Sequence, residues 1–314
     1  EETFKRGALN IKAQTKIIRD RSTTALLDAD RGLGHPVSVQ AMEMAIKKAE
    51  SYDVGIVCVR NSHHFGAAGY YAEIAARQGF IGIVTTSTRG ISMVPTRGTQ
   101  PVLGTNPFAF AAPAGKYDPL VLDFATTVAA VNKVKVRKLR ELQLPDGWVN
   151  DGDGRTIFDP NEAIRIFENK SFGGLNPVGG IGETLGGHKG YGLAVFSHIL
   201  SGAMPGASFS PVRVKNSNAD TPDDLGHYFQ AINPESFRTK EEYENDIEVV
   251  IETLRSVKPS DPDKPVLVPG EPEQISRKDR QKNGIPVNRN LRNLIKEIAQ
   301  NAGVEYFLVN NTTP

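Results

Sequence analysis

The sequence predicts an α/β fold from two alternating patterns. Short apolar runs rich in β-branched residues, at residues 56–59 and 80–84, are typical of buried strands. Residues 36–50 and 67–79 instead repeat apolar side chains at helical spacing. With 314 residues, 39% of them hydrophobic and 23% charged, the chain has the composition of a globular protein and can bury a large core.

Taken in order, the chain alternates further between the two patterns. Strands are expected at residues 23–27, 56–59, 80–84, 108–112, 120–122 and 227–232. Helices are expected at residues 36–50, 67–79, 126–142, 191–204, 239–255, 273–282 and 288–302. Pro36 is suited to the first turn of its helix, Gly79 to a helix end and Thr239 to an N-cap.

Charge and cysteine content restrict the classes of partner and compartment. The net charge of +1 gives no electrostatic reason to expect a nucleic-acid or membrane partner. Residues 190–212 lack Asp, Glu, Lys and Arg, but a helix over 191–204 is only about 21 Å long, so we expect it to be buried in the protein. Cys58 is the single cysteine, which fits a reducing, cytoplasmic location, and no signal-peptide pattern is evident.

Two adjacent histidines mark the candidate active site. His63 and His64 follow the predicted strand at 56–59, and Gly66 and a helix come directly after them. In open α/β sheets, ligands bind at the carboxyl ends of strands. Histidine also exchanges protons near neutral pH, so either residue is a candidate acid or base. The alternative is a surface or hydrogen-bonded histidine, and neighbouring side chains at a strand end diverge, so only one of the two can face a substrate.

Two glycine-containing loops resemble ligand motifs without completing them. Gly180, Gly182 and Gly186 approach the dinucleotide fingerprint, but no strand precedes them as that motif requires. The same region ends in Lys189 at a helix start, where backbone N–H groups can hold an anion; the alternative is a mobile surface loop. Residues 151–154 resemble the opening of a calcium loop but lack its final bidentate acid, so we expect a turn.

Five motifs, in this order, resemble one family. They are Asn61-Ser-His-His-Phe-Gly66, Gly104-Thr-Asn-Pro107, Leu122-Asp-Phe-Ala-Thr126, Gly187-His-Lys-Gly-Tyr-Gly192 and Val268-Pro-Gly-Glu-Pro272. Together they resemble the type 2 malate/L-lactate dehydrogenases, which also include sulfolactate, ureidoglycolate and diketogulonate dehydrogenases. The resemblance implies a mixed sheet with flanking helices that is not a Rossmann fold. It also implies an NAD(P)-dependent, typically dimeric enzyme.

The resemblance also implies roles for particular residues. The family's catalytic histidine corresponds to His64, with His63 as its neighbour. The implied cofactor contacts are Asp123, Phe124, Ala125, Lys189, Gly226, His227 and Tyr228. Arg89 lies where the family also contacts the nucleotide, although the residue type varies there. The family holds the substrate carboxylate with a Ser-His-Gly segment and an arginine, which would precede Glu1.

These residues predict hydride transfer between NAD(P)(H) and a small 2-hydroxy or 2-keto acid. We expect malate and oxaloacetate, with NAD and without a metal ion; L-lactate, sulfolactate and ureidoglycolate are the alternatives within the family. Two other classes remain open from the residues alone: a metal-dependent hydrolase that uses His63 and His64, and a non-catalytic binding protein. We expect residues 23–210 to form the cofactor-binding and active-site region. Residues 1–22 and 226–314 would then form an outer region that makes a homodimer.

Overall fold

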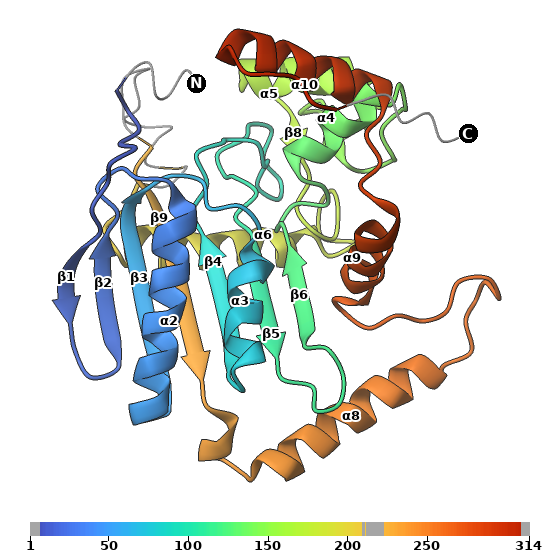
Figure 1. Cartoon of the computed structure of the whole chain (residues 1–314). Coiled ribbons are helices and arrows are strands. Elements are labelled where there is room, and N and C mark those ends of the chain that lie inside the picture. The colour runs from blue at the N-terminus through green and yellow to red at the C-terminus, as the bar shows by residue number, and fades with distance from the viewer. Residues whose placement is uncertain (1–6, 209–210, 212–222, 309–314) are drawn as a thin grey trace.

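A seven-stranded mixed sheet forms the centre of the protein (Figure 1). The computed structural model describes residues 7–208, 211 and 223–308. The strand order is β1-β2-β3-β9-β4-β5-β6. The strands are β1 (Lys16–Asp20), β2 (Thr24–Asp28), β3 (Val54–Ser62), β4 (Ile81–Thr86), β5 (Phe108–Ala112), β6 (Leu120–Phe124) and β9 (Leu225–Ile232). The α/β class and the mixed sheet are therefore confirmed.

Strand directions bring several chain segments to one edge of the sheet. β2 and β3 are parallel, whereas β3–β9, β9–β4, β4–β5 and β5–β6 are antiparallel pairs. Consequently β3, β4 and β6 end at the edge where β9 and β5 begin. The residues just after the first three strands and just before the other two can therefore meet in space.

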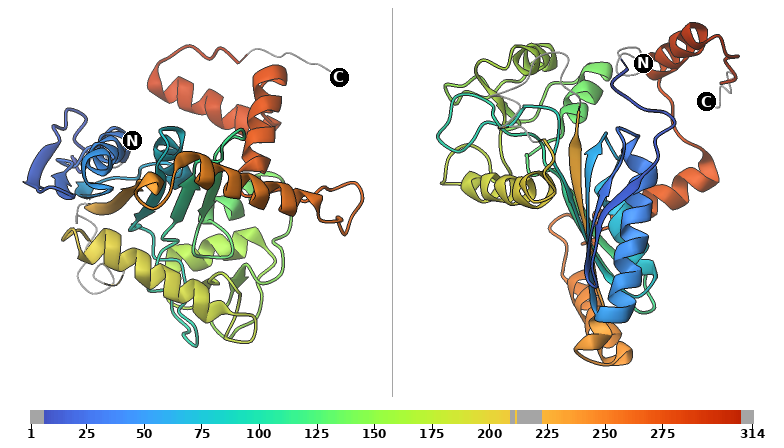
Figure 2. Two further views of the ribbon diagram at one scale, coloured as in Figure 1. Left: turned by 90° about the horizontal axis from the view of Figure 1, so that it is seen from below. Right: turned by 90° about the vertical axis from the view of Figure 1, so that its left-hand side faces the viewer.

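Helices cover both faces of the sheet (Figure 2). On one face, α2 (Gly34–Tyr52) and α3 (Ala68–Arg77) bury small apolar side chains against β-branched residues of the central strands. On the other face lie α6 (Gly187–His198) and the short π-helix η1 (Ile199–Ala203). Small side chains such as Ala45 and Ala72, both fully buried, let the helix axes approach the strands closely.

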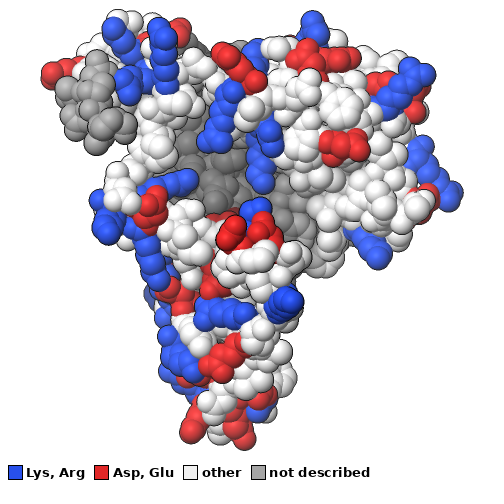
Figure 3. Space-filling view, turned by 90° about the vertical axis from the view of Figure 1, so that its right-hand side faces the viewer, with Lys and Arg blue, Asp and Glu red and all other residues white. Residues whose placement is uncertain are grey.

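Further helices surround this three-layer centre. α4 (Val131–Leu139) and α5 (Pro160–Asn169) share a separate core with β7 (Val149–Asn150) and β8 (Gly174–Leu175). A short 3-10 helix, η2 (Pro234–Ser236), leads from β9 into α8 (Lys240–Ser256), which lies beyond the end of the sheet. α9 (Glu271–Asn283) and α10 (Arg289–Ala302) follow, and α10 reaches α4 through a 2.7 Å hydrogen bond from Asn290 Nδ2 to the Leu139 carbonyl oxygen. Acidic and basic side chains are intermixed over this side of the molecule (Figure 3).

Most predicted elements are confirmed, and the differences have local causes. Thr239 caps α8 in a capping box with Glu242. The helix expected at 126–142 begins instead at Val131, because Thr126 N–H donates to the Thr105 carbonyl oxygen and Val128 N–H donates to the Asn176 carbonyl oxygen. β1, α5, β7 and β8 were not expected from the sequence.

The helix expected to be buried at 191–204 is correct in position but wrong in environment. α6 and η1 bury only one side, and the other exposes apolar side chains, with Phe196 44% and Ile199 55% exposed. The absence of charge in this segment therefore reflects an apolar outer surface as well as a buried one. Among the described helices, none has the length and apolar run that a membrane span needs.

The expected division into a central and an outer region stays a prediction, and the sheet draws strands from both of the assigned regions. β9 comes from the segment assigned to the outer region, yet it lies between β3 and β4 in the middle of the sheet. β1, from the other outer segment, is an outermost strand of the sheet. The outer role of the remaining residues of both segments stays a prediction.

Candidate active site

The two histidines that follow β3 occupy different environments, as their positions predict. β3 continues three residues beyond the expected strand end and has a register shift between Val59 and Ser62, where Asn61 has a φ of 54°. This irregularity shifts the register, so that pairing with β9 resumes only at Ser62, the last residue of β3. His63 is then 6% exposed, whereas His64 is exposed to solvent.

His63 is a buried cation that links three segments. Its Nδ1 lies 3.0 Å from Asp223 Oδ2, and its Nε2 lies 3.0 Å from the Ala8 carbonyl oxygen. Both partners only accept hydrogen bonds, so a ring that satisfies both must carry two protons. The hydrogen bond to Asp223 is the main reason why the pKa of His63 is raised. His63 therefore fastens the turn and is not positioned as a proton donor or acceptor for a substrate.

His64 is held in a neutral, solvent-accessible form. The Gly66 N–H donates to His64 Nδ1 at 3.1 Å, which places the ring proton of the neutral form on Nε2. Gly66 has a φ of 85°, a conformation that glycine adopts without strain. Partial burial, together with the nearby His35, lowers the pKa of His64. At neutral pH the ring is thus uncharged and able to take part in proton transfer.

A buried hydrogen-bond chain joins the ends of β3 and β4 through His227. His227 Nδ1 lies 2.6 Å from Thr86 Oγ1, and its Nε2 lies 2.9 Å from Ser62 Oγ. Its ring stacks on Phe65, with centroids 4.6 Å apart and planes 8° apart. Complete burial lowers the pKa of His227 to about 3, so the ring is neutral. This neutral ring fixes the loop that carries His64 against the end of β4.

His64 lines a cavity of about 360 Å³ at the shared edge of the sheet. The cavity is formed by the turn after β3, the loop after β4, the segment before β5, the start of α4 and the start of β9. Its polar lining residues include His64, Thr86, Ser87, Thr88, Arg89, Ser92, Thr105, Asn132 and Asp223. Of these, only His64 was singled out as catalytic from the sequence; Arg89 was noted as a nucleotide contact. The run Thr85–Thr88 after a strand was the available signal for the other residues.

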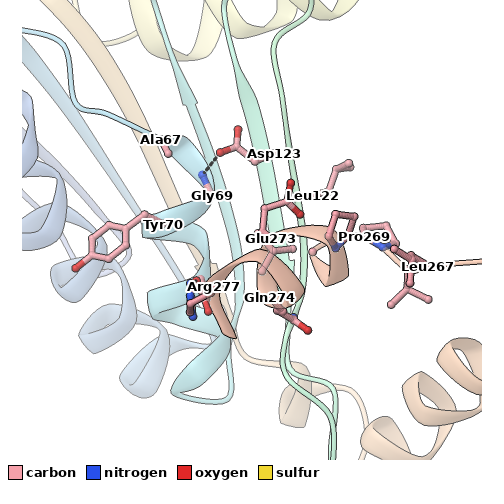
Figure 4. Close-up of a pocket in the computed structure, with 15 residues that line it drawn as sticks. Ala67, Gly69, Tyr70, Leu122, Asp123, Leu267, Pro269, Glu273, Gln274 and Arg277 are labelled. Carbon is pink, nitrogen blue, oxygen red and sulfur yellow. Dashed lines mark hydrogen bonds and ion pairs between the residues drawn. The ribbon is translucent and has the colours of Figure 1, made fainter. Parts of the chain in front are cut away.

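Asp123 lines a second cavity, of about 600 Å³, on the other side of the loop that connects β3 to α3 (Figure 4). Asp123 Oδ2 accepts a 2.8 Å hydrogen bond from the Gly69 N–H, so it caps α3, whose own N-cap residue, Ala67, provides no side-chain acceptor. Loss of water around the carboxyl group, and the nearby Glu273, raise the pKa of Asp123. Residues 267–277 form the opposite wall of this cavity, so the Val268–Pro272 motif lies beside Asp123.

The remaining expected cofactor residues do not line either cavity. Phe124 packs on Phe108, with ring centroids 5.9 Å apart, and Lys189 is exposed in the first turn of α6. Gly226 packs so closely on η1 that an added Cβ would lie 1.8 Å from the Ser201 carbonyl oxygen. The Tyr228 hydroxyl donates to Gln230 Oε1 at 2.7 Å. The cofactor contacts of these residues, and those of Ala125 and His227, stay predictions.

Comparisons with known proteins agree on one family. The family model described as malate/L-lactate dehydrogenase matches residues 2–296. A malate dehydrogenase of Pyrococcus abyssi is 40% identical over 299 residues, which are 95% of this chain and 80% of that protein. An L-sulfolactate dehydrogenase of Methanocaldococcus jannaschii is 37% identical over 301 residues, 96% of this chain and 82% of that protein. The crystal structure of a malate dehydrogenase from Entamoeba histolytica superposes with a TM-score of 0.91, at 34% identity, over 97% of this chain and 84% of that one.

The mixed sheet presents an exposed histidine with a lowered pKa in a cavity at the carboxyl end of β3, an arrangement suited to an enzyme site. The chain belongs to the malate/L-lactate dehydrogenase family, and it is therefore an oxidoreductase of small hydroxy acids that uses a nicotinamide cofactor. Family membership favours this activity over the metal-dependent hydrolase and the non-catalytic binding protein. Within the described part of the chain, no three His, Cys, Asp or Glu side chains gather as metal ligands.

The charge on His63 predicts a pH-dependent contribution to stability. The folded-state pKa is raised above the unfolded value of about 6.5, so stabilisation by the charged ring is complete below about pH 6.5. It is lost as the pH rises through the folded-state pKa. We expect His63→Gln to lower the free energy of unfolding by about 1–3 kcal/mol at pH 6 and by less at pH 9, measured by urea denaturation. His188→Gln, at an exposed position, is the control, and an equal loss for His63→Gln at both pH values would contradict the prediction.

Proposed function

We propose that this enzyme interconverts malate and oxaloacetate with NAD(H), and that His64 is its acid–base residue. The observation that carries this proposal is a neutral, exposed imidazole in a cavity of about 360 Å³ that an arginine also lines. The cavity is suited to a small anionic substrate. The names of the relatives from Pyrococcus abyssi and Entamoeba histolytica support malate over the other hydroxy acids.

His64 has the properties that the proton transfer requires. When bound, the nicotinamide ring accepts hydride from C2 of the hydroxy acid, or donates it to the keto acid. The resting tautomer of His64 carries its proton on Nε2, which suits a hydrogen bond to a keto oxygen. The nitrogen that donates to the keto oxygen in reduction must accept the hydroxyl proton in oxidation, so Nε2 serves both directions. Oxidation starts from the tautomer with its proton on Nδ1, which requires the Gly66 N–H to move off that nitrogen, and reduction starts from the doubly protonated ring. Because the pKa is lowered, the neutral base persists below the usual pH range of histidine.

The second cavity fits the nucleoside part of NAD. Val121, Leu122 and Leu267 provide apolar wall suited to a base, and the carboxylates of Asp123 and Glu273 can accept hydrogen bonds from ribose hydroxyls. The loop from Gly66 to Gly69 separates this cavity from the one at His64. A dinucleotide that crosses this loop would have its ends in the two cavities. Arg277 is paired with Glu73 at 3.4 Å, so the unmatched charge here is negative, which favours NAD over the 2′-phosphorylated NADP.

Steady-state kinetics with purified protein tests the activity and the role of His64. We expect reduction of oxaloacetate with NADH that persists with EDTA, and a kcat at least about 10²-fold lower in His64→Asn, because asparagine cannot transfer the proton. His63→Asn is the matched control, and its kcat should stay within roughly tenfold. Both variants require a melting-temperature check and a profile from pH 5 to 9. An inactive His63→Asn beside an active His64→Asn would refute the assignment.

Cofactor titration tests the two expected nucleotide contacts separately. We expect Lys189→Ala to weaken binding of NADH and NADPH alike, by about 10-fold or more, because a contact between an ammonium group and the pyrophosphate is charge-assisted. Asp123→Asn should instead reduce the preference for NADH over NADPH, because it removes the negative charge while retaining an acceptor for Gly69. The measurement is the quenching or enhancement of cofactor fluorescence, with Lys138→Ala on α4 as the control. Unchanged dissociation constants in Lys189→Ala would exclude that contact.

We also propose a homodimer, because the C-terminal helices expose apolar side chains. On α8, Val249 and Val250 are 60% and 46% exposed, and on α10, Leu294 and Ile298 are 43% and 57% exposed. A second copy would cover such surfaces. Light scattering should give about twice the chain mass of 34.1 kDa, and a mass of 34.1 kDa at micromolar concentration would contradict the dimer.

A cytoplasmic location is proposed from the state of the single cysteine. Cys58 is a free, buried thiol, and burial raises its pKa to about 12, so it is suited to a reducing compartment. Cell fractionation checks this location, and recovery of the enzyme outside the cytoplasmic fraction would contradict it.

A further inference from the structure

One carboxylate on the wall of the His64 cavity is shared by two cations. Asp223 Oδ2 lies 3.0 Å from His63 Nδ1, and Asp223 Oδ1 lies 3.0 Å from Arg89 Nε. Asp223 and Arg89 both line the cavity, whereas His63 lies behind them. We call His63, Asp223 and Arg89 the charge cluster.

The charge cluster retains a net positive charge. His63 faces acceptors at both ring nitrogens, Asp223 on one side and the Ala8 carbonyl oxygen on the other, and so is protonated. Two cations and one carboxylate leave a charge of +1. Arg89 is also the only Lys or Arg among the residues that line this cavity in the described chain. The cavity wall therefore attracts an anion although Arg89 already has an ion-pair partner.

Arg89 is held in one orientation and still has N–H hydrogen-bond donors available for a ligand. Its recorded ion pair within the described residues uses Nε, and the two terminal nitrogens of the guanidinium group carry four further N–H donors. Two of these match the two oxygens of a carboxylate in a bidentate pair. The bond from Nε to Asp223 fixes the plane of the guanidinium group, so less side-chain entropy is lost when an anion binds.

A buried hydroxyl in the same cavity lacks a partner. Ser92 is 3% exposed, and its Oγ has no hydrogen-bond partner among the described residues. A buried hydroxyl without a partner typically costs about 1–3 kcal/mol. A ligand oxygen in the cavity would relieve this cost by accepting from Ser92, which is independent evidence for a polar ligand group near Arg89.

His64 and Arg89 follow two strands that are separated in the sheet by one other strand. His64 follows β3 and Arg89 follows β4, and β9 lies between these strands. Neighbouring strands are about 4.8 Å apart, so the two strand ends are about 10 Å apart. A four-carbon keto dicarboxylate that makes a hydrogen bond of about 3 Å at each end spans about this distance. With its C2 oxygen at His64, its far carboxylate reaches toward Arg89.

We infer that Arg89 and Ser92 form the subsite for the second anionic group of the substrate. Asp223 and His63 hold Arg89 in place as positioning residues. This subsite selects 2-keto acids with a carboxylate or sulfonate on C3 over those with an uncharged group there. The inference rests on the proposed function, which it extends by naming the residues that discriminate among hydroxy acids.

The test compares oxaloacetate with pyruvate in matched variants. Arg89→Gln should raise the KM for oxaloacetate by about 10- to 100-fold, because a charge-assisted pair is lost, while kcat changes little. The same variant should leave kcat/KM for pyruvate within about threefold. Arg89→Lys should give an intermediate KM, and Ser92→Ala should raise it several-fold. Arg97→Gln is the control, because Arg97 is on the same loop, 81% exposed and paired with Glu183 outside this cavity.

Two further readouts separate the possible roles of Arg89. Malonate should inhibit the wild type more strongly than acetate, and Arg89→Gln should abolish this difference. The dissociation constant for NADH should stay within about twofold. Equal losses of kcat/KM for both keto acids, or weaker NADH binding with an unchanged preference for oxaloacetate, would overturn the inference. If the wild type reduces no 2-keto acid, the proposed function itself is wrong; if it reduces them without preferring the dianion, only the subsite is wrong.

Discussion

The buried ring of His227 holds the active-site edge of the sheet together. β3 and β4 both end at this edge, but β9 lies between them, so they share no backbone ladder. His227, on β9, reaches Ser62 at the end of β3 and Thr86 at the end of β4 with one imidazole. A neutral imidazole has one donor and one acceptor, which suits two hydroxyl partners. Because both nitrogens are hydrogen-bonded, burying the ring leaves no polar atom without a partner. The turn that carries His64 depends on this link for its position.

Three histidines that lie close together in space differ in charge and exposure because their surroundings differ. His227 is sealed among hydroxyl groups and stays neutral, since burial disfavours its charged form. His63 faces a carboxylate and a carbonyl oxygen, so its charged form is favoured. His64 remains open to solvent, with a lowered pKa and a backbone N–H on one nitrogen. Of the three rings, only that of His64 is exposed to solvent, and the other two are buried in hydrogen bonds that hold the turn around it.

Local patterns in the sequence predicted the elements well wherever the determining interactions are local. Thr239 and Glu242 form their capping box within one turn, and Gly79 follows α3 with a φ of 90° as a helix end requires. α5 was missed although Asp159 followed by Pro160 is an N-cap and first-turn signal. The start of α4 was misplaced because Thr126 and Val128 bond to Thr105 and Asn176, partners that helix periodicity does not reveal. β1, with all five residues exposed, has no apolar alternation to detect.

The amino-acid sequence was sufficient to establish the α/β class, the position of the histidine pair after a strand, and the family, since five motifs in order carry that information. It also required the two side chains to diverge, because adjacent residues at a strand end cannot share a direction. Long-range folding determines which histidine is buried and charged, and it brings Asp223 and Arg89, 134 residues apart in the chain, together beside it. It likewise decided that Asp123 caps α3. These outcomes depend on strand order and on which groups lose water, and both arise from long-range packing that no local pattern encodes.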